Sequence, residues 1–153
     1  MKKTLSTALL RLALAVCLGV LAGGIACRDP DRMIFEVLGD VDQARFRRGR
    51  ALALPCWTCH DLAGTVEKVG PSLLGVYGRR SGMARNHSAS PAMIGAVIVW
   101  DDRSLAAFLS DPEGFVPGNR MVSPAIRDST ALSHLLFYLR HVTRPGARQP
   151  KAR

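Results

Sequence analysis

The chain has 153 residues, of which 48% are apolar, and this size and composition predict one compact domain with a single core. Lysine and arginine number 21 against 12 acidic residues, so the formal net charge is +9. The basic residues are not interleaved with aromatic side chains, which makes nucleic acid a poor candidate for a partner. An acidic protein partner or anionic lipid headgroups suit the charge better, and a basic surface that only aids solubility is the plain alternative.

Residues 1–26 have the pattern of a secretory signal peptide. Lys2 and Lys3 precede an apolar run over residues 12–26, which ends in small residues. The run is shorter than the roughly 18–20 residues that a membrane-spanning helix needs. We therefore predict export from the cytoplasm.

Cys27 follows this segment directly and leaves three outcomes open. It resembles the lipid-accepting cysteine of bacterial lipoproteins, although Gly24 stands where their motif usually has leucine. Lipidation would also account for an odd thiol outside the cytoplasm. Plain cleavage after Ala26 and an uncleaved N-terminal anchor are the other two outcomes.

Residues 27–39 contain Pro30 and several charges without a sustained period, so a linker is predicted there. A domain over residues 40–144 follows. Asp40 is predicted to cap its first helix, which runs into the motif "CWTCH" at 56–60. The partial apolar stripe of this helix consists of Val41, Ala44, Phe46 and Ala51 or Leu52.

Residues 64–93 are rich in glycine, serine and charged residues and predict a long loop. A loop of this length is uncommon in a compact domain unless it wraps something or carries function. A short helix should follow and end at Asp111-Pro112. Its predicted cap is Asp101 or Asp102, and its inward residues are Leu105, Phe108 and Leu109.

The last helix has the clearest pattern. Asp128 or Ser129 can cap it, and it should close around residues 141–144. Its apolar residues recur at i, i+3, i+4 and i+7, namely Leu132, Leu135, Leu136 and Leu139. No strand pattern with convincing alternation occurs, so the predicted class is all-α with long loops, and a basic C-terminal tail over residues 145–153 follows.

The motif "CWTCH" places Cys56, Cys59 and His60 together, and three kinds of site use such residues. Structural zinc normally needs a second ligand pair, and the chain has no second C-x-x-C and no H-x-x-x-H. A thioredoxin-like redox pair belongs to a βαβ setting, which the helix and loop pattern does not offer. C-x-x-C-H is the attachment signature of c-type haem, so one covalent haem c is predicted. Cys56 and Cys59 would bond the porphyrin, and His60 would ligate the iron.

Beyond this motif the chain resembles the class I c-type cytochromes, from about residue 49 to residue 139. The resemblance is carried by the order and separation of four stretches: "CWTCH" at 56–60, "VGPSLLGVYGRRSG" at 69–82, "VIVWDDRSLAAFLSDPEGFVPGNRM" at 97–121 and "LLFYL" at 135–139. It implies a small fold of three or more helices with long loops wrapped around one haem. The chain departs from the family where Ala53 stands near the position of a phenylalanine, and where the loop over 83–93 lacks a tyrosine.

The resemblance also implies individual roles. Met121 becomes the second axial ligand, whereas an isolated methionine is ordinarily core filler. The carbonyl of Pro71 is expected to accept the free ring N–H of His60. Arg79 and Trp100 are expected to donate to a haem propionate, the alternatives being a solvated arginine and an ordinary core tryptophan.

Four further residues complete what the resemblance implies. Gly49 and Tyr138 should mark the crossing of the first and last helices. His87 could replace the missing tyrosine at a propionate, but an exposed loop histidine is the preferred interpretation. His134 lies off the leucine stripe and should face solvent.

The implied function is that of a mono-haem one-electron carrier, not an enzyme, between periplasmic or membrane redox partners. Acidic docking surfaces on these partners would meet Lys68, Arg80 and Arg120 around the haem edge. The alternative is a dedicated electron-accepting subunit of a dehydrogenase or oxidase complex. A ligand-sensing haem protein would need an open sixth position, which Met121 would fill.

Overall fold

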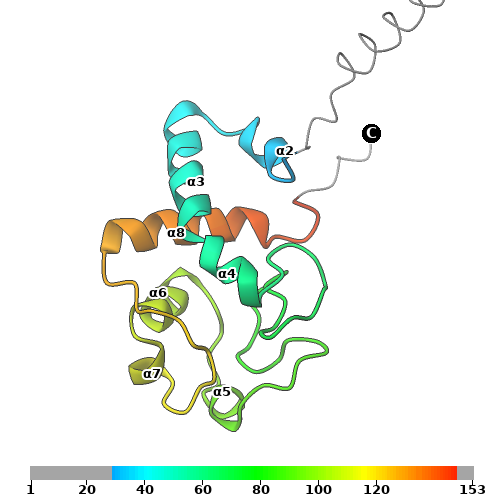
Figure 1. The fold of residues 1–153 in the computed structure, drawn as a ribbon, viewed down its shortest axis with the longest axis vertical. Helices are drawn as coiled ribbons and strands as arrows, with labels where there is room; N and C mark the ends of the chain where they lie inside the picture. Colours follow the sequence, from blue (N-terminus) through cyan, green and yellow to red (C-terminus); the bar gives the residue numbers. More distant parts are fainter. Residues whose placement is uncertain (1–28, 148–153) are drawn as a thin grey trace, which may run out of the picture.

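Helices make up the regular structure of residues 29–147, which are the residues that this computed structural model describes (Figure 1). Their bounds are α2 (Arg32–Phe35), α3 (Asp40–Leu52), α4 (Leu54–Cys59), α5 (Pro91–Gly95), α6 (Asp102–Ser110), α7 (Pro112–Phe115) and α8 (Ser129–Val142). Within this range the only strand-like pairing is an isolated bridge between Arg80 and Val99. The predicted all-α class is confirmed, and the predictions for residues 1–26, Cys27 and residues 148–153 lie outside the described residues.

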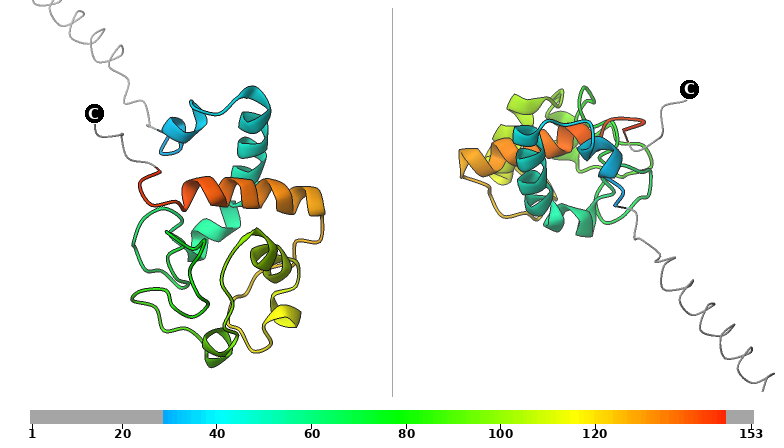
Figure 2. Two further views of the ribbon diagram at one scale, coloured as in Figure 1. Left: turned by 180° about the vertical axis from the view of Figure 1, so that it is seen from behind. Right: turned by 90° about the horizontal axis from the view of Figure 1, so that it is seen from above.

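Helices α3 and α8 cross in the upper half of the molecule in Figure 1, and the further views of Figure 2 show the same crossing. Gly49 lies at the contact: a Cβ atom on it would be 2.1 Å from the carbonyl oxygen of His134 and 2.6 Å from the Cβ of Tyr138. Phe46 packs edge-on against Tyr138, with 4.9 Å between the ring centroids. The missing side chain of Gly49 therefore lets the two helices touch, as expected.

The predicted caps are right for two helices and wrong for one. Asp101 and Ser104 form a reciprocal capping box at the start of α6, and the side chain of Asp128 accepts from the N–H of Ala131 in α8. The predicted leucines of α8 are buried. Helix α3 instead begins after Gly39, and no side chain caps it.

The predicted apolar stripe of α3 is wrong in part. Val41 is 79% exposed, and Ala44 and Ala51 are exposed as well. Helix α8 covers α3 only along the side that carries Phe46 and Gly49, which are its buried residues. A single crossing contact buries a narrower strip than the sequence pattern indicated.

Part of the predicted linker over residues 27–39 is packed against the domain. Ile34 on α2 belongs to the core cluster of α3 and α8. The side chain of Asp31 is buried and accepts a 2.8 Å hydrogen bond from the hydroxyl of Tyr138, while Gln43 donates to the carbonyl of Leu38 at 3.0 Å. Four helical residues are too few to show a period, so the sequence pattern did not reveal this contact.

No helix among residues 29–147 is both long and apolar enough to span a bilayer.

Helix α5 interrupts the region that was predicted to be loop up to residue 93. Ser90 caps it by accepting from the N–H of Met93 at 3.2 Å, and Pro91 occupies its first turn. Proline at this position lacks an N–H that the first turn of a helix would leave without a partner. Five residues again give no period, although Ser-Pro is a recognised start signal.

Replacing Val97 with glycine is expected to stabilise the protein by about 1 kcal/mol. Val97 follows α5 with φ at +54°, a left-handed conformation that strains a β-branched residue. Its side chain is 58% exposed, so the substitution loses little burial. Denaturant unfolding of the holoprotein measures the change.

Val99→Gly is the matched control, because Val99 is also 58% exposed but has no positive φ. This variant should lower the free energy of unfolding. If both variants raised it, the backbone of Val97 would not be strained.

Candidate functional site

The two cysteines of "CWTCH" lie on α4, which follows α3 after a break at Ala53. Residues three apart on a helix share a face, so the thiols of Cys56 and Cys59 lie on the same side. Both are half-buried, and burial raises the pKa of Cys56. The helix ends at His60, whose extended backbone has φ at −124° and ψ at 145°. The motif thus sits at a helix end, as predicted.

The imidazole of His60 is oriented by a backbone carbonyl. Its Nδ1 lies 2.7 Å from the carbonyl oxygen of Pro71, the contact implied for this pair. A proton on Nδ1 that is donated to this carbonyl leaves the Nε2 lone pair for a metal. Burial lowers the pKa of His60, which favours the neutral ring that a metal requires.

Gly70 shapes the same site and was not singled out from the sequence. A Cβ atom at this position would lie 2.4 Å from Cε1 of His60, so only glycine leaves room for the ring. The N–H of Gly70 donates to the carbonyl of Cys59 at 2.8 Å, which ties the loop to the end of α4. The signal in the sequence is the pair Gly70-Pro71, which belongs to the predicted loop over residues 64–93 and marks a chain turn without indicating a contact with His60.

Met121 is held by a turn that follows α7. Its N–H donates to the side-chain oxygen of Asn119 at 2.8 Å. The amide nitrogen of Asn119 donates to the carbonyls of Pro112 at 2.8 Å and Val116 at 3.0 Å, and Gly118 adopts φ at +79°. Asn119 therefore fixes the backbone of Met121 to α7, a positioning role that sequence analysis missed.

Two clusters of buried side chains flank the region between Cys56 and Met121. Cys56 packs against the cluster of α3 and α8, and Met121 packs against the cluster around Trp100 and α6. Four partly buried residues contact both clusters: Leu73, Tyr77, Leu109 and Ile126. The thiol of Cys56 and the thioether of Met121 therefore border one apolar region, which suits a large apolar ring.

Arg79 is half-buried and has no acidic partner among residues 29–147. Its guanidinium donates to the carbonyls of Ser72 at 3.0 Å and Leu74 at 3.2 Å, and burial lowers the pKa of Arg79. Such a cation is poorly compensated, and a carboxylate beside it would stabilise it.

Trp100 lies next to Arg79, because their backbones exchange a 3.0 Å hydrogen bond from the N–H of Trp100 to the carbonyl of Arg79. The indole is 7% exposed and packs against Phe108 with 5.3 Å between centroids. No described residue accepts a hydrogen bond from the indole N–H. Two thiols, an oriented imidazole, a thioether and two donors that lack a carboxylate together fit a haem with its propionates.

The two other histidines of interest differ from their predictions. The side chain of His87 is only 20% exposed, and its Nδ1 lies 3.5 Å from the carboxylate of Glu67. The preferred interpretation of His87 as an exposed loop histidine is therefore wrong, because the loop folds back on the segment that carries Glu67. His134 is half-buried beside α3 rather than fully solvent-facing.

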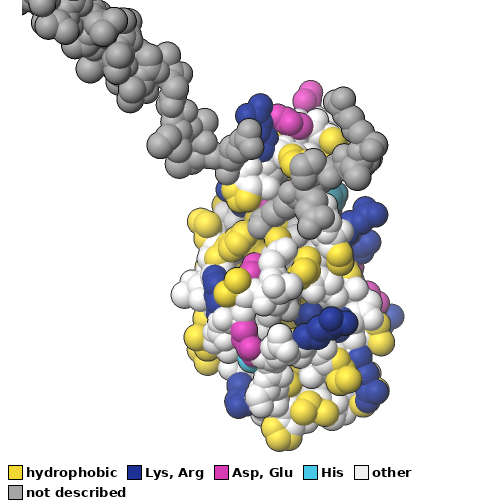
Figure 3. Space-filling model, turned by 90° about the vertical axis from the view of Figure 1, so that its right-hand side faces the viewer, with side chains coloured by type: hydrophobic (Ala, Val, Ile, Leu, Met, Phe, Trp, Pro, Cys, Tyr) yellow, Lys and Arg dark blue, Asp and Glu magenta, His cyan; other side chains and the backbone are white. Residues whose placement is uncertain are grey.

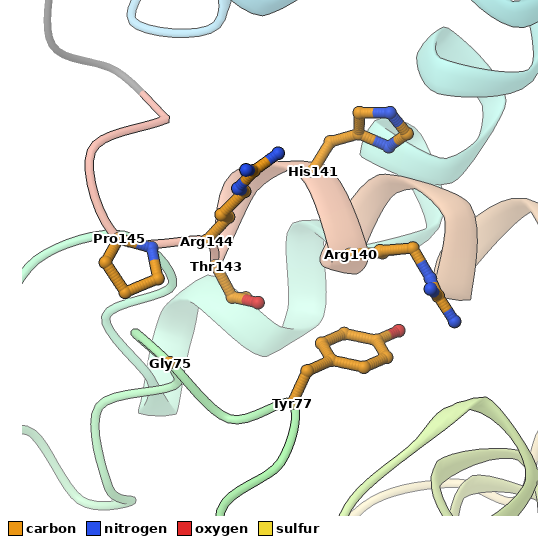
Figure 4. A pocket seen from close by; sticks show the side chains of 7 residues that line it. All are labelled: Gly75, Tyr77, Arg140, His141, Thr143, Arg144 and Pro145. Atoms are coloured by element: carbon orange, nitrogen blue, oxygen red, sulfur yellow. The ribbon is translucent and has the colours of Figure 1, made fainter.

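A hollow of about 380 Å³ lies at the C-terminal end of α8 (Figure 4). Arg140 lies over the ring of Tyr77, 5.1 Å from its centroid, and pairs with Asp102. No residue predicted to hold haem lines this hollow, so it is separate from the site. Its lining consists of Gly75, Tyr77, Arg140, His141, Thr143, Arg144 and Pro145.

Comparison with known proteins gives individual relatives, whereas no family model matches the chain. Cytochrome c2 iso-2 of Magnetospirillum fulvum is 34% identical over 85 residues, which are 56% of this chain and 88% of that protein. Cytochrome c of Euglena viridis is 38% identical over 82 residues, which are 54% of this chain and 80% of that protein. Cytochrome c-550 of Nitrobacter winogradskyi is 32% identical over 109 residues, which are 71% of this chain and 95% of that protein.

These relatives are matched over most of their own length, and their similarity agrees with the all-α fold described above. Cytochromes of this family carry a covalently attached haem c and transfer single electrons. The chain belongs to the class I c-type cytochromes, and it is a mono-haem electron-transfer protein rather than an enzyme.

Proposed function

We propose that Cys56 and Cys59 bond the haem, and that Nε2 of His60 and the thioether of Met121 ligate its iron. The observation that carries this assignment is the 2.7 Å contact between Nδ1 of His60 and the carbonyl of Pro71, which leaves Nε2 available. The haem supplies the one-electron chemistry when it is bound. Ligation by histidine and methionine raises the reduction potential relative to harder ligand pairs.

The chain contributes ligands that keep their places in both oxidation states. Gly70 lies against the ring of His60, and Asn119 restrains the backbone of Met121 at 2.8 Å. Rigid restraints on both ligands limit the reorganisation that accompanies a change of charge. Electron transfer then requires no bond to form or break within the protein.

We assign the propionates to Arg79 and Trp100. A charge-assisted hydrogen bond from Arg79 would compensate a partly buried carboxylate and also end the isolation of this half-buried cation. The support is the absence of any acidic partner for Arg79 among residues 29–147 and the adjacent backbone of Trp100.

Replacing Arg79 with glutamine is expected to lower the reduction potential by roughly 60 mV, which corresponds to a tenfold change in a one-electron equilibrium. Removing a positive charge beside the haem favours the more positive ferric state. Spectroelectrochemical titration measures the shift. Arg48→Gln, which changes an exposed arginine on α3, is the control. Equal shifts in both variants would show that net charge, and not a propionate contact, is responsible.

The chain is proposed to work in the periplasm, where it exchanges electrons with redox proteins that have acidic docking surfaces. The signal-peptide pattern of residues 1–26 and the resemblance to bacterial c2 and c-550 cytochromes support this location. A lipid on Cys27, or retention of the N-terminal segment, would attach it to the membrane.

Intact-mass measurement on protein isolated from its native membranes and periplasm tests these assignments together. Covalent haem and a lipid on Cys27 would each add a distinct mass to the chain. Cleavage after Ala26 would subtract the mass of residues 1–26. Cys56→Ser and Cys59→Ser should each weaken or prevent covalent attachment, whereas a chain without any haem increment would refute the proposed function.

A further inference from the structure

One end of the molecule carries an exposed apolar surface flanked by arginines. We call it the distal tip and define it by Arg80, Met83, Arg85, Ile94, Val97 and Val99. Its four apolar side chains are 61% (Met83), 51% (Ile94), 58% (Val97) and 58% (Val99) exposed. In Figure 3 hydrophobic side chains gather at this lower end, which is the end of α5 in Figure 1, with lysine or arginine beside them.

The distal tip is a built surface, because two chain segments are tied together beneath it. Arg80 pairs with Val99 in an antiparallel bridge, and the N–H of Ser81 donates to the carbonyl of Ile98 at 2.7 Å. Gly82 lies so close to α5 that a Cβ on it would be 2.8 Å from the Cα of Ile94. The exposed side chains therefore stand on a fixed backbone, which lowers the entropy that docking would cost.

The charge around this apolar surface is mainly positive. Residues 79–100 contain three arginines and no aspartate or glutamate, and Arg120 reaches the same loop by donating to the carbonyl of Ser88 at 2.7 Å. The acidic side chain that approaches this loop, Glu67, lies 3.5 Å from His87. A surface that recognises the distal tip would thus combine an apolar centre with an acidic rim.

The opposite end of the fold carries charges of both signs. Residues 29–42 contain five acidic residues and one arginine, but Arg50 pairs with Asp29 and Asp31 of this segment, and Arg47 lies over the ring of Phe35. This end holds α2 and the start of the described chain, far along the long axis from α5 (Figure 1). The distal tip therefore has the more uniformly positive surface of the two ends, and it would be attracted to a negatively charged partner during encounter.

The distal tip also borders the proposed propionate donors. The N–H of Gly78 donates to the carbonyl of Trp100 at 2.8 Å, and the N–H of Trp100 donates to the carbonyl of Arg79 at 3.0 Å. Arg80 and Val99 are the neighbouring residues on these two segments, and both belong to the distal tip.

We propose that the distal tip is the docking surface for a redox protein with an apolar centre and an acidic rim. This inference rests on the proposed function. In each encounter, one electron would pass between the one-electron centre of the partner and the haem of this protein, so that one is oxidised as the other is reduced. No proton and no leaving group would be transferred.

Kinetics with native membranes test the proposal. The holoprotein, purified with the N-terminus that it has in the cell, is mixed with membranes from the source organism, in which the gene for this protein has been deleted. The initial rates of haem reduction and oxidation are then measured. The double variant Arg80→Glu, Arg85→Glu is compared with Arg48→Glu, Arg144→Glu, which changes the same charge at exposed arginines away from the tip. Met83→Ser is compared with Val41→Ser, since both side chains are exposed.

The expected result is a KM about tenfold higher for the tip double variant at low ionic strength, with an unchanged kcat and a difference that shrinks as salt is added. The control double variant should stay within about twofold, and Met83→Ser should raise KM at every salt concentration. Retention of the charge-transfer band of methionine-ligated ferric haem shows that each variant is folded. If the tip double variant does not fold, the milder substitutions Arg80→Gln and Arg85→Gln are measured in its place.

Several results would overturn the proposal. Equal KM values for tip and control variants would place docking elsewhere. Loss of binding to phosphatidylglycerol vesicles with unchanged KM would identify the tip as a membrane surface, and loss of concentration-dependent self-association with unchanged KM would identify it as a contact with a second copy. A wild-type protein that the membranes neither reduce nor oxidise would refute the electron-carrier function itself, which separates that failure from a failure of the docking surface.

Discussion

Replacing Met121 with alanine is expected to lower the reduction potential by a few tenths of a volt, because the choice of axial ligand spans about 0.8 V across haem proteins. The methionine thioether favours the ferrous state more than water or hydroxide does. The same variant should bind carbon monoxide when reduced, since the sixth position is then accessible. Redox titration and the optical spectrum of the reduced protein with carbon monoxide measure the two effects.

Met93→Ala is the matched control for Met121→Ala. Met93 is also partly buried and packs against the same cluster around Trp100, so its loss should cost stability without a comparable change of potential. A Met121→Ala protein that keeps the wild-type potential and does not bind carbon monoxide would show that another group ligates the iron.

Replacing Gly49 with alanine is expected to destabilise the folded holoprotein by about 2 kcal/mol or more, because the added methyl group overpacks a close contact. The new Cβ would lie 2.1 Å from the carbonyl oxygen of His134 and 2.6 Å from the Cβ of Tyr138. These two atoms cannot move without the backbone of α8, so the added methyl group can be accommodated only if the two helices move apart. Denaturant unfolding, followed by far-ultraviolet circular dichroism, gives the change in free energy.

Gly95→Ala provides the comparison for Gly49→Ala. Gly95 is the last residue of α5, has no positive φ, and nothing lies within 4 Å of a Cβ built on it. The substitution should be neutral or slightly stabilising, because alanine favours the helical conformation more than glycine does. Equal destabilisation by both variants would mean that the helix crossing tolerates the methyl group.

Local patterns in the sequence account for the parts of the fold that were predicted well. The leucine repeat of α8 and the caps at Asp101 and Asp128 involve residues within a few positions of one another. Such contacts are formed inside one helix, so neighbouring residues are sufficient to identify them. The all-α class followed from the same local signals.

Contacts between distant segments account for what was missed. Asp31 meets Tyr138 across 107 positions, and this contact turns part of a predicted linker into a packed segment. Gly70 contacts the ring of His60, and Asn119 bonds to Pro112; neither has a periodic signature. Whether α3 buries a wide or a narrow stripe depends on where α8 crosses it, which no local pattern contains.

The chemistry of this protein could be predicted from its amino-acid order, because haem attachment requires two thiols and an imidazole at a local spacing, and the residues proposed for it, Cys56, Cys59 and His60, have that spacing. The orientation of His60 toward Pro71, the restraint of Met121 by Asn119 and the exposed distal tip emerged from the folded arrangement alone. The physical reason is that bond-forming groups are specified by residue type and spacing, whereas ligand geometry and surface exposure arise from packing between segments that are far apart along the chain.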